Sequence, residues 1–120
     1  GVYIQYANVR AQKLINDSKL DVSGFSILSK ELDNNDKSLL RSFIKFEFYF
    51  EQTIKNNEPH HLADYLYEIS QKFNGMYQGL NILQNENTLL KKNKLKITDL
   101  FLQHSNLLME CLGILPVKKM

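Results

Sequence analysis

Hydrophobic residues recur every three or four positions through most of this chain, which is the period of an amphipathic α-helix. The clearest stripe runs along residues 62–83 and contains Leu62, Leu66, Ile69, Phe73, Met76 or Tyr77, Leu80 and Leu83. A second stripe along residues 37–55 contains Leu39, Phe43, Phe46, Phe50 and Ile54. The local alternation at 45–48 is also compatible with a strand, but the length of the segment favours a helix. We predict one helix for each stripe, with these side chains in the core.

Two further helical segments, and the residues that begin and end helices between them, complete the pattern. Residues 3–15 place Tyr3, Tyr6, Ala7, Arg10 and Leu14 on one face, and residues 95–112 form the last apolar segment. Residues 33–36 offer helix caps, and Pro59 suits only the first turn of a helix. Gly113 stands where a left-handed C-cap belongs, with Pro116 after it. Residues 25–32 are short enough for only a brief helix.

These boundaries predict an all-α fold, a helical bundle of about four main helices plus short helices. The length of 120 residues suits one domain, 1–120, and 43% hydrophobic residues suit a folded core. Five glycines and two prolines leave few turns, which favours long helices. Gly1 is not an initiator methionine, so we expect a fragment of a longer protein.

Charge and cysteine content exclude several classes of function. A net charge of +2 is modest for a protein that depends on phosphate contacts alone. The single cysteine, Cys111, excludes an internal disulfide framework and favours a reducing, cytoplasmic setting. No apolar run reaches the roughly 18 residues of a membrane span, so we expect no membrane association.

Three blocks of sequence, in this order, resemble the anticodon-binding domain of arginyl-tRNA synthetases. The blocks are Tyr3-Ile-Gln-Tyr-Ala-Asn-Val-Arg10, then Glu58-Pro-His-His-Leu-Ala-Asp-Tyr-Leu-Tyr-Glu-Ile-Ser-Gln-Lys-Phe-Asn-Gly-Met-Tyr77, and Cys111-Leu-Gly-Ile-Leu-Pro-Val-Lys-Lys-Met120. They are similar to the family's Q-Y-A-x-x-R helix, its E-P-x-x-L-A-x-Y-L helix and its terminal methionine. The resemblance implies a C-terminal, DALR-type helical domain that binds the tRNA(Arg) anticodon stem-loop. Aminoacylation, with its ATP and magnesium, would belong to a catalytic domain outside this chain, in a monomeric cytoplasmic enzyme.

The resemblance also implies which side chains contact RNA. Tyr6 with Arg10, and Phe73 with Tyr77, each lie four residues apart and so share a helix face. Aromatic rings stack on unpaired bases, and a guanidinium binds base edges or phosphate. The competing interpretation makes Phe73 a core residue and Tyr6 and Arg10 a solvated edge. The resemblance further assigns RNA contacts to the tail residues Lys118, Lys119 and Met120.

Two other features lie near these candidates. Gly75 and Gly79, four apart, are predicted to form a flat groove that admits a neighbouring helix or the RNA backbone. A basic run, comprising Lys91, Lys92, Lys94 and Lys96, is either solvated or a phosphate contact.

No residue pattern predicts catalysis, a cofactor or a metal site in this chain. His60 and His61 are adjacent, so on a helix their side chains would point about 100° apart and not share a metal. His104 and Cys111 are two turns apart, which is too far. Two alternatives to the tRNA-binding prediction remain: a helical protein-interaction module, and the related anticodon domain of another class I synthetase.

Overall fold

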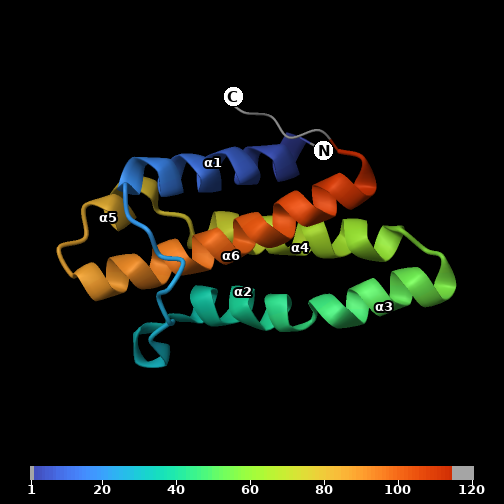
Figure 1. The fold of residues 1–120 in the computed structure, drawn as a ribbon, viewed down its shortest axis with the longest axis horizontal. Coiled ribbons are helices and arrows are strands. Elements are labelled where there is room, and N and C mark those ends of the chain that lie inside the picture. The colour runs from blue at the N-terminus through green and yellow to red at the C-terminus, as the bar shows by residue number, and fades with distance from the viewer. Residues whose placement is uncertain (1, 115–120) are drawn as a thin grey trace.

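The computed structural model describes residues 2–114, which form only helices and connecting segments (Figure 1). The elements are α1 (Val2–Ser18), the 3-10 turn η1 (Ser29–Glu31), α2 (Asn34–Ile44), α3 (Phe46–Asn56), α4 (His60–Met76), α5 (Gly79–Leu83) and α6 (Thr88–Leu112). No β-strand occurs among these residues, and the prediction of an all-α bundle is confirmed. None of the described helices is both long and apolar enough to cross a membrane.

Three long helices, α1, α4 and α6, pack against one another and enclose most of the core (Figure 1). α1 and α4 run in the same direction and α6 runs in the opposite one, while α2 and α3 follow each other along the far side of α4. The fully buried residues include an aromatic pair, Phe73 of α4 and Phe101 of α6, whose parallel rings lie 4.5 Å apart. Because α1 and α4 are parallel neighbours, equivalent turns of the two helices stay side by side.

Two predicted helix ends are confirmed, the cap at residues 33–36 and the left-handed Gly113, and Asn57 marks a further end. Asp33 accepts a hydrogen bond from the backbone N–H of Asp36, and Asp36 accepts one from the backbone of Asp33, which completes a capping box for α2. Asn57 ends α3 in the left-handed conformation with φ of 53°. Gly113 ends α6 with φ of 71°, a conformation that costs glycine little.

The prediction of one helix over residues 37–55 is wrong, because the segment breaks at Lys45. Its backbone N–H lies within reach of the carbonyls of both Arg41 and Ser42, which closes α2 before α3 starts at Phe46. Beyond the break the end of the expected stripe leaves the core, because Phe50 is 40% and Ile54 68% exposed. Phe46 keeps its predicted inward position, and Tyr49 joins it against the buried ring of Tyr65.

The stripe along residues 62–83 is also interrupted. α4 ends at Met76, and Tyr77 adopts an extended conformation with ψ of 122°. The chain then turns into α5, so that Leu80 is 66% exposed while Ile82 enters the core. Residues 25–32 contain a single 3-10 turn and no longer helix. α6 begins seven residues before the predicted start at Leu95, because the Asn87 side chain caps its first turn.

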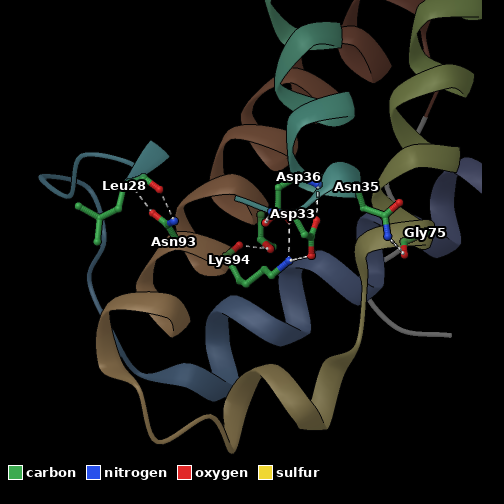
Figure 2. Close-up of polar contacts among 8 residues, drawn as sticks. Leu28, Asp33, Asn35, Asp36, Gly75, Asn93 and Lys94 are labelled. Atoms are coloured by element: carbon green, nitrogen blue, oxygen red, sulfur yellow. Dashed lines mark hydrogen bonds and ion pairs between the residues drawn. The ribbon is translucent and has the colours of Figure 1, made fainter. Parts of the chain in front are cut away.

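A polar network attaches α2 and the preceding loop to α6 (Figure 2). The Lys94 ammonium donates to Oδ1 of Asp36 at 2.7 Å and to Oδ2 of Asp33 at 2.8 Å. Beside it, the Asn93 amide donates to the Leu28 carbonyl and accepts from the Leu28 N–H. Burial raises the pKa of the Asp33 carboxyl, but hydrogen bonds from Lys94 and from backbone N–H groups outweigh it and hold that pKa below its usual range. Lys94 is therefore a structural residue.

Candidate nucleic-acid interface

The arginine of the first sequence block lies between two aromatic rings. The guanidinium carbon of Arg10 is 4.0 Å from the centre of the Tyr6 ring and 5.0 Å from the centre of the Tyr77 ring. Tyr6 belongs to α1, and Tyr77 is the residue that caps α4 at its C-terminal end. The parallel packing of α1 and α4 thus joins two residues predicted from one block with one predicted from another. We call Tyr6, Arg10 and Tyr77 the cation–aromatic cluster.

Two hydrogen bonds fix the orientation of the guanidinium. Nη1 of Arg10 donates to Oδ1 of Asn74 at 3.1 Å, and Nη2 donates to the Tyr6 hydroxyl at 2.8 Å. Among the described residues these bonds use two of the five guanidinium donors, so the remaining ones are available to an acceptor from outside. Tyr6 as a residue is 42% exposed. The cluster therefore presents an oriented fork beside an accessible aromatic face.

Tyr77 stands at the edge of a groove between α1 and α5. The groove has a volume of about 290 Å³ and is lined by Lys13, Leu14, Asp17, Tyr77, Gly79, Leu80 and Leu83. Gly79 lies directly beneath Tyr77: a Cβ at this position would be 2.6 Å from the Tyr77 hydroxyl oxygen. The missing side chain of Gly79 is what allows the Tyr77 ring to occupy its position beside Arg10.

The structure places the third predicted aromatic residue, Phe73, in the core. Its exposed fraction is 0%, and it stacks on Phe101 while its ring centre lies 5.8 Å from that of Tyr77. A base has no access to the Phe73 ring in this arrangement. Phe73 supports the cluster by packing behind Tyr77.

Three residues of this surface were not predicted from the sequence to contact RNA. Asn74 orients Arg10, and Tyr3 and Tyr67 form a second exposed aromatic pair with ring centres 5.6 Å apart. Tyr3 lies seven residues before Arg10 on α1, and Tyr67 lies seven before Asn74 on α4. Spacing of seven marks a shared helix face, but only the tertiary structure shows that the two faces are adjacent.

The structure gives the lysines and glycines that the sequence singled out different environments. Of the basic run, Lys94 is held by two aspartates and Lys96 donates to the Ser23 carbonyl, while Lys91 and Lys92 are partly exposed. The predicted groove between Gly75 and Gly79 is wrong, because these glycines belong to different helices, α4 and α5. The other candidates, Lys118, Lys119 and Met120, lie outside the described residues.

The prediction that His60 and His61 point apart is also wrong. Their ring centres are 4.2 Å apart, and both rings turn back toward the carboxylate of Glu58. Pro59 caps α4 at this point, so the two histidines begin the helix. Helical side chains lean toward the N-terminus, which brings both rings toward Glu58, two residues before the helix begins.

The DALR anticodon binding domain family matches residues 4–120, nearly the whole chain. The chain belongs to this family. It is similar to the arginine–tRNA ligase of Pasteurella multocida, with 33% identity over 98% of this chain, and to that of Haemophilus influenzae, with 31% identity over 98%. The arginine–tRNA ligase of Buchnera aphidicola is 33% identical over 80% of the chain.

This DALR domain spans only about a fifth of the length of those relatives, 21% for the Pasteurella and Haemophilus proteins. The similarity covers both helices that build the cation–aromatic cluster, and the family assignment bears out the resemblance seen in the three sequence blocks. The remaining four fifths or so of the length of those two relatives lies outside the region that matches this chain.

Proposed function

We propose that this DALR domain binds the anticodon stem-loop of an arginine tRNA, in service of an arginine–tRNA ligase. The observation that carries the proposal is the Arg10 guanidinium, held between the rings of Tyr6 and Tyr77 with donors to spare. Unpaired bases are recognised by aromatic stacking together with hydrogen bonds to their edges. The cluster offers both within one surface.

The modest charge of the chain fits this mode of binding. With a net charge of +2, phosphate attraction alone would give little affinity, so stacking and base-edge contacts contribute a large share. We propose that Lys118, Lys119 and Met120 add contacts from the tail, as the family resemblance implies.

The domain serves the reaction by positioning the tRNA. Contact with the anticodon loop orients the distant acceptor end toward a catalytic domain that binds ATP, magnesium and arginine. The proposed setting is a monomeric cytoplasmic enzyme, with this chain as its C-terminal part. The cation–aromatic cluster has no role in the chemical step.

A titration with two RNA hairpins tests the proposal. We expect the chain to bind the arginine anticodon stem-loop more tightly than the same stem with a scrambled loop, and both affinities to fall as salt increases. Fluorescence anisotropy with labelled hairpins at several salt concentrations measures both quantities. Equal affinity for the two hairpins would remove the claim of anticodon recognition.

A helical protein-interaction module remains the second candidate. The observation in its favour is the set of exposed apolar side chains on α2 and α3, which includes Ile44, Phe48 and Ile54. If this function is the principal one, Tyr6→Ala and Tyr77→Ala leave RNA affinity unchanged while Phe48→Ser removes binding of a protein partner.

Two glycine substitutions separate RNA binding from stability. Gly79→Ala puts a methyl group 2.6 Å from the Tyr77 hydroxyl oxygen, which is too close, so we expect the ring to swing away from Arg10 and the RNA affinity to fall several-fold. Gly75→Ala meets nothing within 4 Å in the last turn of α4, and we expect it to stabilise the fold by about 0.5–1 kcal/mol. Thermal denaturation and anisotropy on both variants provide the comparison. An RNA affinity that falls equally in the two would show that Tyr77 is not the cause.

A further inference from the structure

Three metal-ligating side chains converge at the turn between α3 and α4. Nε2 of His61 lies 2.8 Å from Oε2 of Glu58, and Nε2 of His60 lies 3.7 Å from the same oxygen. One ligand atom from each of the three residues falls within 4.8 Å of the other two. His60 and Glu58 are exposed and His61 is partly exposed, so an ion reaches the three atoms directly from solvent.

We propose that Glu58, His60 and His61 form a binding site for a divalent transition-metal cation of the zinc class. Two imidazoles and a carboxylate are ligands that Zn²⁺ accepts readily, whereas Mg²⁺ and Ca²⁺ prefer oxygen ligands alone. Ligand atoms around a tetrahedral ion with Zn–N bonds of ~2.0–2.1 Å are separated by roughly 3.3 Å. The observed separations approach this value, so small rotations of the side chains complete the site.

Coordination replaces an existing hydrogen bond. In the structure Nε2 of His61 pairs with the Glu58 carboxylate. In the bound state each imidazole gives the lone pair of Nε2 to the ion and carries its one proton on Nδ1. Glu58 contributes Oε2, and water fills the remaining positions. The backbone is already shaped for this arrangement, with Asn57 in the left-handed conformation and Pro59 at the helix cap.

The local electrostatics set the strength of the site. The first turn of α4 is the positive end of the helix dipole, which opposes a cation, while the Glu58 carboxylate favours it. With three protein ligands on an open surface, we expect a reversible site that a chelator strips without unfolding the domain. The site lies at the opposite end of α4 from Tyr77, roughly 24 Å away, and is independent of the proposed RNA contacts.

Titration of the chain with ZnCl₂ tests this inference, in a Cys111→Ser background that removes the exposed thiol as a competing ligand. Long-range ¹H–¹⁵N spectra report each histidine ring. We expect the Nε2 signals of His60 and His61 to shift and to saturate at one equivalent of zinc. His104, which stacks on Phe43 and bonds the Leu100 carbonyl, serves as the internal control and stays unchanged. MgCl₂ at the same concentration should leave all three rings unchanged.

Matched variants complete the test. His61→Gln and Glu58→Gln should each weaken zinc binding roughly tenfold or more, because each removes one ligand. Glu51→Gln, an exposed carboxylate on α3, should leave it unchanged. Unaltered affinity in His61→Gln, shifts centred on His104, or loss of all binding on removal of Cys111 would each overturn the proposal.

Discussion

Arg10→Lys should lower the affinity for the arginine anticodon stem-loop by roughly 10- to 100-fold, although it keeps the positive charge. Lysine lacks the planar fork, so it cannot lie between the Tyr6 and Tyr77 rings and still donate to Asn74 and an incoming acceptor. Arg10→Ala should lose at least as much. Anisotropy at one fixed salt concentration measures the loss, and the salt dependence should stay close to that of the unchanged chain in Arg10→Lys.

A neighbouring lysine supplies the matched control. Lys13 is one turn along α1, lines the same groove as Tyr77 and pairs at the surface with Asp17, so Lys13→Ala removes a nearby charge and leaves the guanidinium and both rings of the cluster in the sequence. We expect it to change affinity only about two- to threefold. If Arg10→Lys binds as tightly as the unchanged chain, or if Lys13→Ala matches its loss, the cluster acts only as a source of charge.

Lys94→Met should produce the largest loss of stability, about 3 kcal/mol of unfolding free energy. The Asp36 side chain is 1% exposed, and Lys94 is its ionic partner within the described residues. Without the ammonium, a buried carboxylate stays uncompensated while α2 loses its attachment to α6. Urea denaturation measures the free energy, and we expect the melting temperature to fall by roughly 10 °C.

Two comparisons check that cause. Lys94→Met combined with Asp36→Leu removes both charges, and it should recover much of the stability because no unpaired charge is left in the core. The pH dependence of stability provides the second check, because the fold lowers the pKa of Asp33, the other ionic partner of Lys94. The ionised Asp33 carboxylate stabilises the fold at pH values above the unfolded pKa of 3.8. This stabilisation is lost as the pH falls through the lower pKa of the folded state. Asp36→Leu also removes the capping hydrogen bond from the Asp33 N–H, a loss of about 1 kcal/mol. A double variant that stays no more stable than Lys94→Met after this loss is added back would show that the charge is not the cause.

The helices and their ends were predictable because short-range chemistry determines them. The Asp33 capping box, the left-handed Gly113 and the position of Pro59 each depend on neighbours within four residues. Family membership was predictable for a similar reason, since the three blocks retain their order and spacing. The break at Lys45 was not, because an unbroken stripe across it has the same local pattern as a continuous helix.

The candidate site was only half predictable. Tyr6 and Arg10 share a helix face by spacing alone, and that part was correctly derived from the sequence. Phe73 and Tyr77 also share their spacing, yet one is buried against Phe101 and the other lies beside Arg10. Equal spacing cannot separate them, because burial depends on which helix covers each face.

By itself the sequence determined an all-α bundle, the principal caps and the family to which the chain belongs. Only the tertiary structure decided that α1 and α4 lie in parallel, so that Arg10 enters between Tyr6 and Tyr77, and that His60 and His61 converge on Glu58. The physical reason is the distance along the chain over which each interaction acts. Helix propensity and capping act within one or two turns, whereas these groupings depend on contacts between residues more than sixty positions apart or on side-chain rotations that no periodicity encodes.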